Sequence, residues 1–317
     1  MKIIITGALG HIGSHLIREL PCFFPDSKIM MLDNMLTQRY SSLFNLPSIG
    51  NYTFIETDVI KSDLEKLIDS DTVVIHLAAI TDAASSFDNA EAVEANNYQA
   101  TAKVAHACAV TGAKLITLSS TSVYGTQSNR VSENCTDEEL KPQSPYAKTK
   151  LREEKLVQEL STKQNLQAVT FRFGTIFGAS IGMRFHTAVN KFCWQATLGQ
   201  PLTVWKTAYQ QKRPYLALSD AVRAICHTIA IDNFDGGIYN VVTKNATVNE
   251  IVDTIRLYIP NARVNFVDSV IMNQLSYEVD SSKMQATGFI SSGNLVHDIG
   301  ETISLLRNCS SGYFKTI

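Results

Sequence analysis

The feature that most constrains this chain is a set of three evenly spaced glycines near its N-terminus. Gly7, Gly10 and Gly13 follow an apolar run at residues 3–5, and a helical pattern begins directly after them. A short, fully apolar run is typical of a strand buried on both faces of a parallel sheet. The sequence therefore predicts a strand, a tight glycine turn and a helix N-terminus, which together open an α/β fold with a doubly wound parallel sheet.

The spacing of these glycines, G-x-x-G-x-x-G, is a variant of a dinucleotide-binding fingerprint. Glycines let the backbone approach a pyrophosphate, whose negative charge is attracted by the N–H groups and the positive dipole end of the helix. Asp33 ends the next apolar run, 20 residues after Gly13, which is the separation expected of an acid that binds a ribose. We therefore expect this end of the chain to bind a dinucleotide.

Composition and charge narrow the class of protein. The chain has 317 residues, of which 45% are hydrophobic and 18% charged, as in an ordinary globular protein. A net charge of −2 without a long basic run gives no reason to expect nucleic acid or a membrane as a partner. No apolar stretch approaches the ~20 residues that span a bilayer, and the N-terminal run is too short for a signal peptide. Six scattered cysteines without a C-x-x-C pair predict reduced thiols, no metal site and a cytoplasmic protein.

Apolar runs alternate with helical patterns along the following part of the chain, which predicts right-handed βαβ units in a parallel sheet. The expected elements are strands at residues 29–32, 52–59, 71–79 and 114–119, and long helices at residues 91–110 and 145–164. Because ligands of such sheets bind at the carboxyl ends of the strands, the residues at these ends are the candidates for a site.

Two of the expected strands end in residues that suit a bound dinucleotide. Asp58 could accept a hydrogen bond from an adenine amine, or it could equally cap a helix over residues 61–67. The small side chains of Ala78 and Ala79 would let a flat cofactor lie against the backbone. His76 could be a catalytic base, although a single histidine inside an apolar strand is more often a packed core residue.

Hydroxyl and phenol groups follow at the next strand and helix. Ser119, Ser120 and Thr121 come at the carboxyl end of a strand, and Tyr146 and Lys150 lie four residues apart, on one helix face. A free tyrosine has a pKa near ~10 and is a poor base at neutral pH. A lysine ammonium one turn away, together with a nicotinamide cation, favours the phenolate, so we expect a pKa of Tyr146 well below its usual range.

Taken in order, these motifs resemble those of an extended short-chain dehydrogenase/reductase. Within that superfamily the chain is most similar to the NAD-dependent nucleotide-sugar epimerase/dehydratase family, in particular to its UDP-glucose 4-epimerase-like members. The resemblance is strong over residues 1–240 and loose beyond them. It rests on the glycine turn after Thr6, Asp33, Asp58-Val59, His76-Leu-Ala-Ala79, Asn97-x-x-x-Thr101, Ser119-Ser120, Val123-Tyr-Gly125 and Pro145-Tyr-x-x-x-Lys150.

The resemblance implies three catalytic residues. Ser120 would bond the reacting sugar oxygen, Tyr146 would be the general base, and Lys150 would tune Tyr146 and hold the nicotinamide ribose. Asp33 implies NAD as cofactor because a carboxylate repels a 2′-phosphate, although Arg39 leaves NADP open. The implied cofactor-binding residues are Gly7, Gly10, His11, Ile12, Gly13, Asp33, Asn34, Asp58, Val59, Leu77, Ala78, Ala79, Thr81, Asn97, Ser119, Tyr146, Lys150 and Phe173.

On the substrate side the chain departs from the family pattern. Thr175 stands where most relatives have an asparagine that contacts the substrate diphosphate, and Arg213 matches a pyrophosphate-binding arginine but is followed by Pro214 instead of an acid. A second arginine is missing, since residues 268–279 contain neither Arg nor Lys. Arg184 could bind a phosphate or a sugar carboxylate, or form a surface ion pair. The expected substrate-binding residues are Ser86, Thr121, Thr175, Arg184 and Arg213.

The resemblance also implies a domain organisation and an assembly. We expect residues 1–178 to form an NAD-binding Rossmann domain to which residues 213–242 return. Residues 179–212 and 243–317 are expected to form a smaller substrate-binding lobe. Helices such as those at residues 91–110 and 145–164 pair between subunits in relatives, so we expect a homodimer packed through the small side chains Ala92, Ala95, Ala102, Ala105 and Ala109.

The reaction implied is hydride chemistry at C4 of a nucleotide-diphosphate sugar through a 4-keto intermediate. A standard 4,6-dehydratase carries an Asp-Glu pair where this chain has Thr121 and Ser122. A 4-epimerase is therefore favoured, with a non-standard dehydratase, a keto-sugar reductase or another epimerase as alternatives. A non-catalytic NAD sensor or interaction module is a remote alternative, which the presence of Ser120, Tyr146 and Lys150 disfavours.

Overall fold

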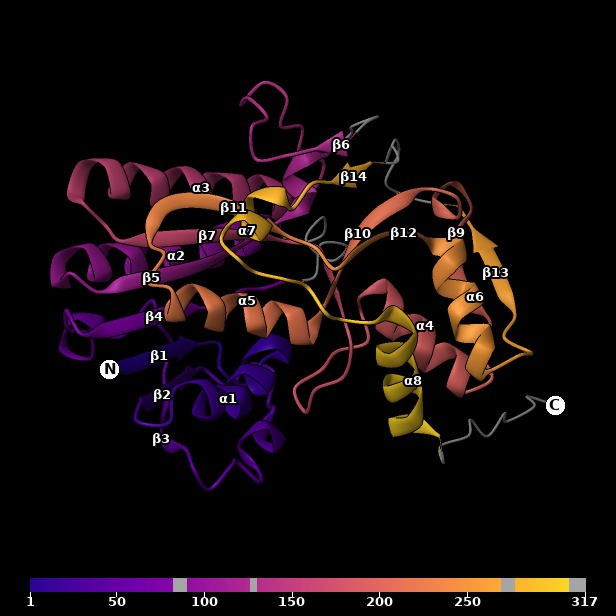
Figure 1. Ribbon diagram of the computed structural model, residues 1–317, viewed down its shortest axis with the longest axis horizontal. Helices are drawn as coiled ribbons and strands as arrows, with labels where there is room; N and C mark the ends of the chain where they lie inside the picture. The colour runs from indigo at the N-terminus through magenta and orange to yellow at the C-terminus, as the bar shows by residue number, and fades with distance from the viewer. Residues whose placement is uncertain (82–89, 126–129, 269–276, 308–317) are drawn as a thin grey trace.

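The computed structural model describes residues 1–81, 90–125, 130–268 and 277–307, and its largest element is a seven-stranded sheet (Figure 1). The strands of this sheet are β1 (Lys2–Thr6), β2 (Lys28–Asp33), β3 (Asn51–Glu56), β4 (Thr72–His76), β5 (Lys114–Ser120), β7 (Ala168–Phe173) and β11 (Asp235–Val241). Their order is β11-β7-β5-β4-β1-β2-β3, and every neighbouring pair is parallel, which confirms the predicted doubly wound α/β class.

The chain changes its direction across the sheet at β1. It moves outward from β1 through β2 to β3, and it then returns to the other side of β1, where β4 pairs. Ligands of open α/β sheets bind outside the carboxyl ends of the strands at such a switch point. In this chain that place is the edge where β1 and β4 end, at Thr6 and His76.

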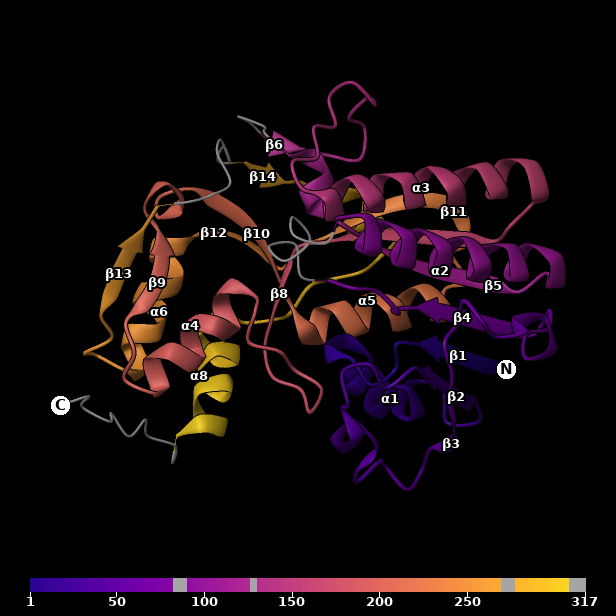
Figure 2. The same ribbon diagram turned by 180° about the vertical axis from the view of Figure 1, so that it is seen from behind.

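Helices cover both faces of the sheet, as the two views in Figures 1 and 2 show. The helices α1 (His11–Phe23) and α5 (Leu218–Ala230) pack on one face. The helices α2 (Ala90–Thr111) and α3 (Pro145–Gln164) pack on the other. Because successive side chains of a strand point to opposite faces, the apolar strands supply both cores.

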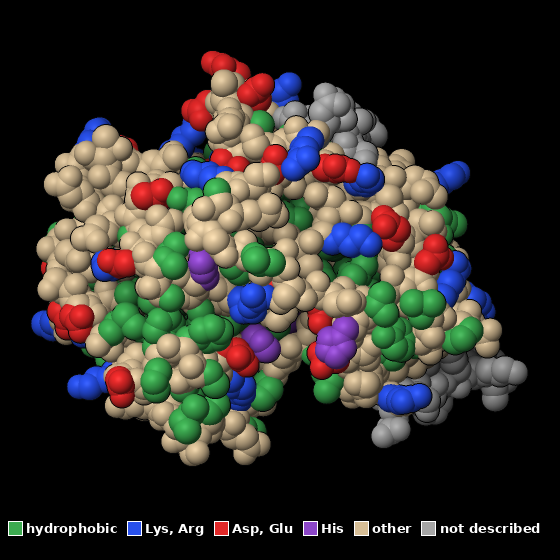
Figure 3. Space-filling model, viewed as in Figure 1, with side chains coloured by type: hydrophobic (Ala, Val, Ile, Leu, Met, Phe, Trp, Pro, Cys, Tyr) green, Lys and Arg blue, Asp and Glu red, His purple; other side chains and the backbone are tan. Residues whose placement is uncertain are grey.

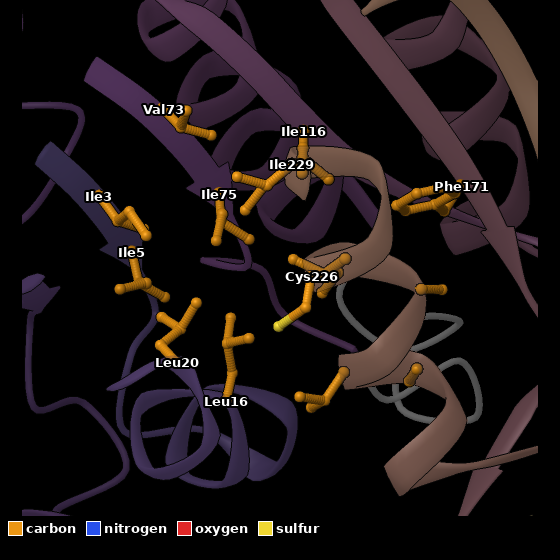
Figure 4. Close-up of a cluster of buried hydrophobic side chains, with 14 of the residues drawn as sticks. Ile3, Ile5, Leu16, Leu20, Val73, Ile75, Ile116, Phe171, Cys226 and Ile229 are labelled. Atoms are coloured by element: carbon orange, nitrogen blue, oxygen red, sulfur yellow. The ribbon is translucent and has the colours of Figure 1, made fainter. Parts of the chain in front are cut away.

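The first strand illustrates how one apolar run serves two cores. Ile3 and Ile5 face α1 and α5, whereas Ile4 faces α2 and α3, and all three are fully buried. Figure 4 shows Leu16 of α1 and Cys226 of α5 gathered over the side chains of the strands. Burial of each large aliphatic side chain contributes roughly 1.5–3 kcal/mol, so these cores fix the sheet and the turn that follows β1.

The interpretation of Asp58 as the N-cap of a helix over residues 61–67 is wrong. Oδ1 of Asp58 accepts a hydrogen bond from the N–H of Ile60 at 3.0 Å, and only a short 3-10 turn, η2 (Leu64–Lys66), follows. A carboxylate that binds the N–H two residues ahead stabilises a turn in competition with a helix.

Two strands end earlier than the sequence predicts. The third strand stops at Glu56 instead of residue 59, and the fourth stops at His76 instead of residue 79. After the fourth strand, the side-chain oxygen of Thr6 accepts the N–H groups of Leu77 and Ala78, both at 3.2 Å. The chain therefore leaves the ladder and turns along the carboxyl edge of the sheet.

Within the described residues, three smaller sheets and four further α-helices complete the fold. The sheets are β12-β10-β8, β13-β9 and β14-β6. Their strands are β6 (Arg130–Val131), β8 (Thr175–Phe177), β9 (Leu202–Trp205), β10 (Lys212–Ala217), β12 (Lys244–Thr247), β13 (Val264–Val267) and β14 (Glu278–Val279). The helices are α4 (Ala188–Thr197), α6 (Val248–Tyr258), α7 (Ser282–Ala286) and α8 (Leu295–Leu306), and the short 3-10 turns are η1 (Tyr40–Leu43), η4 (Thr121–Tyr124) and η5 (Lys206–Ala208).

A separate hydrophobic core lies where α4, α6 and α8 pack together with β9. We call this region the smaller lobe; it is at the right of Figure 1. A reciprocal capping box of Thr247 and Glu250 starts α6. Within residues 213–242, which are expected to return to the Rossmann domain, α5 packs on the large sheet and β11 is one of its edge strands, whereas β10 joins the three-stranded sheet. The boundaries between domains stay a prediction.

The surface carries charges of both signs. Figure 3 shows acidic and basic side chains intermingled over one face, with a notch between the α1 side of the molecule and α8. Among the helices of the described residues, none is long and apolar enough to cross a membrane. Of the alanines expected at a dimer interface, Ala105 is buried in the chain's own core, while Ala95 is exposed and Ala102 is half-buried.

Candidate active site

A cavity of about 350 Å³ opens at the carboxyl ends of the central strands, where the switch point predicts a site. Its volume lies within the range of small-molecule sites. Most of the predicted site residues line it, namely Gly7, Gly10, His11, Ile12, Gly13, Asp33, Asn34, Asp58, Val59, Leu77, Ala78, Ala79, Thr81, Ser119, Ser120, Tyr146, Lys150, Phe173, Thr175 and Arg184. Asn97, Thr121 and Arg213 are described but do not line the cavity, and Ser86 lies outside the described residues.

The glycine turn forms the wall beside the first helix. A Cβ at Gly7 would lie 2.7 Å from the N atom of Ala78, and one at Gly13 would lie 2.5 Å from the carbonyl oxygen of Ala8. Any side chain at these positions would therefore push the turn away from its neighbours. Gly10 precedes α1, and no side chain caps this helix N-terminus. The first N–H groups of the helix are thus suited to a diphosphate, which fits a dinucleotide here.

Asp33 lies at the end of β2 and is fixed by the backbone. Its Oδ2 accepts the N–H of Leu9 at 3.1 Å, and its Oδ1 accepts the N–H of Met35 at 3.0 Å. A carboxylate offers about four acceptor positions, so two remain for the hydroxyls of a ribose. The bond to Leu9 ties this acid directly to the glycine turn.

Cations gather on the same side of the cavity. Burial, followed by the charges of Arg39, His186, His15 and Arg184, lowers the pKa of His11 to about 3, so its imidazole is neutral at physiological pH. Burial and the nearby Arg184 lower the pKa of Arg39 to about 10, against the opposing effect of Asp33. Arg39 nevertheless keeps its charge at neutral pH. The sequence analysis considered Arg39 only for a 2′-phosphate, but its position suits any anionic ligand of this cavity.

The segment after β8 reaches back onto the glycine turn. The N–H of Gly182 donates to Oγ of Ser14 at 2.9 Å, and Nδ1 of His11 shares a hydrogen bond with Oγ of Ser180 at 2.7 Å. Arg184 donates to Oγ1 of Thr81 at 2.7 Å. We call residues 178–187 the returning segment; it brings Arg184, His186 and Thr187 to the cavity.

Asn97 acts from behind the cavity wall. It is buried in α2, where its side-chain oxygen accepts the N–H of Ile80 at 2.8 Å and its amide donates to the carbonyl of Ile80 at 2.9 Å. Ile80 lines the cavity. Asn97 therefore holds the strand exit in place instead of facing a ligand itself.

Ser120 is oriented by Ser122, a residue that the sequence singled out only because it is not an acid. Oγ of Ser120 accepts both the N–H of Ser122 at 3.2 Å and the O–H of Ser122 at 2.9 Å. A hydroxyl has two acceptor positions and one donor, so the O–H of Ser120 is left to donate to a ligand oxygen. A serine that precedes a helical turn often accepts the N–H two residues ahead, so the Ser120–Ser122 spacing could have predicted this contact.

Ser119 and Thr121 use their polar groups inside the protein. Ser119 donates to the buried carboxylate of Glu154, which also forms two bonds with Arg172 at 2.9 and 2.7 Å. The hydroxyl of Thr121 donates to the carbonyl of Phe173 at 3.3 Å. These bonds fix the end of β5 and so fix Ser120 between them.

Tyr146 and Lys150 lie on the first turns of α3, which Ser144 caps by accepting the N–H of Ala147 at 3.1 Å. Nζ of Lys150 lies 5.8 Å from the centroid of the Tyr146 ring and 2.8 Å from Oε2 of Glu153. Both partners of this ion pair are buried. The helix spacing therefore brings a phenol and an ammonium together at one wall of the cavity, with a carboxylate directly behind the ammonium.

In the protein without ligands, the pKa of Tyr146 is raised, and its lowering by Lys150 together with a bound nicotinamide stays a prediction. Burial raises the pKa of Tyr146, the Lys150 ammonium lowers it, and Glu153 raises it again, so the pKa lies above the usual value. For Lys150, burial alone would lower the pKa, but Glu153, Tyr146 and Glu154 together raise it. The four-residue spacing predicts the effect of Lys150 on Tyr146, whereas burial and Glu153 become visible only in the structure.

His76 is buried, as the packed-core interpretation predicts, yet it also touches the cavity. Its Nδ1 shares a hydrogen bond with Oγ1 of Thr6 at 2.7 Å. Burial, and then the charge of Lys150, lowers the pKa of His76 to about 3. An imidazole with this pKa is too weak a base to hold a proton at neutral pH.

Arg213 lies on β10, away from the cavity. Its guanidinium is 5.4 Å from the ring centroid of Tyr277, and Nη2 donates to Oε1 of Gln211 at 2.9 Å. Tyr277 in turn donates to the carbonyl of Thr121 at 3.1 Å. The substrate-binding role expected for Arg213 stays a prediction.

This chain resembles known proteins of one family. A family model described as "NAD dependent epimerase/dehydratase family" matches residues 3–241. A Bacillus subtilis protein named as an uncharacterized UDP-glucose epimerase is 31% identical over 296 residues, which are 89% of this chain and 90% of that protein. A trifunctional Arabidopsis thaliana protein, whose name begins with UDP-glucose 4,6-dehydratase, is 31% identical over 302 residues. That match covers 91% of this chain but only 44% of the Arabidopsis protein.

Solved structures have the same fold over nearly the whole length of this chain. A UDP-glucuronic acid 4-epimerase from Bacillus cereus, in complex with UDP-glucuronic acid and NAD, has a TM-score of 0.84 and 27% identity, with 97% and 99% of the two chains covered. A UDP-N-acetylglucosamine 4-epimerase from Methanobrevibacter ruminantium, in complex with UDP-N-acetylmuramic acid, has a TM-score of 0.84 and 25% identity, with 96% and 97% covered.

Proposed function

Because the chain belongs to the NAD-dependent epimerase/dehydratase family, with NAD as its cofactor, we propose that it is a 4-epimerase of a UDP-linked sugar. The relatives and solved structures compared above are named for UDP-sugars, which supports a UDP-linked substrate. The choice of epimerase over dehydratase depends on the cavity itself.

The observation that carries the choice is the distribution of carboxylates in the cavity. Among the described residues that line it, the acids are Asp33 and Asp58, which end or follow strands on the glycine-turn side. Thr121 and Ser122, directly after Ser120, carry only hydroxyls. Elimination of water needs an acid and a base beside the reacting carbons. Beside Ser120, the described part of the cavity offers the phenol of Tyr146 and the ammonium of Lys150 but no carboxylate, which suits removal and return of one proton by Tyr146.

The residues then divide the work as follows. NAD, when bound, supplies the acceptor and later the donor of the C4 hydride. Tyr146 takes the proton of the C4 hydroxyl and gives it back to the C4 oxygen after the keto-sugar has presented its other face. Ser120 donates its free O–H to the same oxygen, and Lys150 stabilises the phenolate of Tyr146.

A 4,6-dehydratase is the second candidate, because 31% identity connects the chain to a trifunctional Arabidopsis protein with that activity in its name. The test incubates the purified holoenzyme with UDP-glucose, UDP-galactose, UDP-glucuronic acid and UDP-N-acetylglucosamine, and it follows the products by NMR and mass spectrometry. Unchanged mass with inverted C4 supports the epimerase. Loss of one water indicates the dehydratase, and retained NAD without turnover of any sugar indicates a sensor.

We also propose that the protein is a homodimer that pairs through α2 and α3. These helices lie side by side on one face of the sheet and present Ala95 and Ala102 at or near the surface. Sedimentation velocity at micromolar concentration should give twice the chain mass of 35.0 kDa. A species of one chain mass at that concentration contradicts the proposal.

A further inference from the structure

A buried carboxylate stands directly behind the lysine of the cavity. Oε2 of Glu153 accepts the ammonium of Lys150 at 2.8 Å and the hydroxyl of Thr101 at 3.0 Å. Glu153 and Lys150 are each 5% exposed. Thr101 comes from α2, so two helices hold this one oxygen atom. The ammonium is thereby fixed at the cavity wall by a group that does not line the cavity itself.

Stabilisation of the fold does not explain the buried Lys150–Glu153 ion pair well. Oε1 of Glu153 is buried without a hydrogen-bond partner among the described residues. An unpaired buried acceptor is unfavourable, and apolar residues often replace buried ion pairs without loss of stability. The neighbouring Glu154 differs, because both of its oxygens are bonded by Arg172. Glu153 therefore carries a cost in folding that calls for another role.

The charges around Tyr146 show what that role is. On α3 the phenol faces Lys150 and Glu153, with Glu154 further along. From β4 comes His76, which is neutral, and from β7 comes Arg172, which is paired with Glu154. The α2 helix contributes the uncharged Thr101. Lys150 and Glu153 thus cancel, and loss of the Tyr146 proton leaves this wall with a net negative charge.

We propose that Glu153 is a positioning residue that holds the Lys150 ammonium and offsets its charge, so that Tyr146 keeps its proton until oxidised cofactor and sugar are bound. The inference rests on the proposed function, in which Tyr146 must both take and return a proton in each turnover. A group that works in both directions is most effective when neither of its protonation states is strongly favoured. Lys150 alone would hold the phenolate too firmly for the return step.

The test replaces Glu153 by glutamine, which has the same shape and no charge. The acidic limb of the kcat–pH profile should move to lower pH by about one unit or more, as expected when a charge within a few ångströms is removed. The phenolate absorbance of Tyr146, read as the difference between Glu153→Gln and the double variant with Tyr146→Phe, should move in the same direction. A kcat–pH profile that does not move in Glu153→Gln overturns the proposal. A profile that moves without a matching change in the phenolate absorbance of Tyr146 also overturns it.

Three matched variants separate this effect from a structural one. Glu154→Gln removes the adjacent buried carboxylate and should lower the melting temperature with little movement of the pH limb. Thr101→Val removes a bond to Glu153 but no charge, and it should also leave the limb in place. Glu153→Met places a second type of neutral side chain at this position. If the role of Glu153 is electrostatic, the fold should tolerate at least one of the two neutral variants. Failure of both neutral variants to fold therefore contradicts the proposal.

The outcome stays distinct from that of the proposed function. The phenolate titration needs no sugar and no turnover, so it reports on Glu153 even if none of the UDP-sugars is converted. Conversely, epimerisation of a UDP-sugar together with an unmoved titration in Glu153→Gln retains the function and rejects the role of Glu153.

Discussion

The cavity wall is built in two different ways. At the glycine-turn end, the wall consists of backbone from consecutive residues, and Asp33 is held by two backbone N–H groups. Side chains such as Arg184 and His186 instead arrive on the returning segment, which is more than 160 residues away in the sequence from the turn that it contacts. The first part of the wall depends on local chain geometry, and the second depends on long-range contacts. We expect substitutions in the glycine turn to affect cofactor binding and substitutions of Arg184 to affect substrate binding.

The largest effect is expected at Tyr146, which lines the cavity from α3. Tyr146→Phe keeps the ring but removes the group that accepts the sugar proton, so turnover should fall by ~10²–10⁴ with little change in substrate affinity or NAD content. Steady-state kinetics and the absorbance of bound cofactor measure this. Tyr40→Phe, at an exposed position, is the control and should behave as wild type. Near-normal turnover in Tyr146→Phe would refute the assignment of the base.

The glycine-turn end is tested by Gly13→Ala. The new methyl group would lie 2.5 Å from the carbonyl oxygen of Ala8, so the turn must shift, at a cost of roughly 1–3 kcal/mol in stability. We expect a large loss of bound NAD and a lower melting temperature. Gly10→Ala is the matched comparison, because its methyl group meets its nearest neighbour at 3.2 Å and should be tolerated better. Equal NAD content in the two variants would show that local crowding does not define this end.

A second test of the glycine-turn end is Asp33→Asn, which removes the negative charge of the side chain but retains its shape. NAD should bind wild type far more tightly than NADP, and the variant should lose most of this preference because repulsion of a 2′-phosphate is gone. Each tenfold change in the ratio of dissociation constants corresponds to about 1.4 kcal/mol. Isothermal calorimetry with both dinucleotides gives this ratio. Equal affinities in wild type would contradict the role of Asp33.

The smallest effect is expected on the returning segment, from Arg184→Met. Loss of a charged hydrogen-bond donor at the cavity should raise KM for the sugar by about tenfold or more, with NAD content and kcat nearly unchanged. Thr81→Val removes the hydroxyl that accepts from Arg184 at 2.7 Å but keeps the guanidinium, so it should raise KM less. A fall in NAD content with unchanged KM would reverse the comparison and assign Arg184 to the cofactor.

The contrast also explains what could be predicted from the sequence. The glycine spacing, Asp33 and the Tyr146–Lys150 pair act over a few residues, so their patterns predict the fold and the cofactor correctly. Glu153 could not be interpreted in the same way, because its role depends on Thr101 in another helix and on burial that no local pattern records.

Strand ends were missed for a related reason. The fourth strand stops at His76, where the side chain of Thr6, 70 residues earlier, accepts the N–H groups of Leu77 and Ala78. The apolar pattern continues through these residues, so it predicts a longer strand than the ladder permits. Asp58 likewise forms a turn with Ile60, although its residue type suits a helix cap equally well.

Gly182 has a consequence for which substitutions this part of the molecule can tolerate. A Cβ at this position would lie 2.4 Å from the carbonyl oxygen of Leu9, so the returning segment sits directly against the turn proposed to hold the cofactor diphosphate. Any side chain at residue 182 would force these two segments apart, although they are distant in the sequence. A single added methyl group would therefore disturb both the glycine turn and the segment that carries Arg184 and His186 to the cavity.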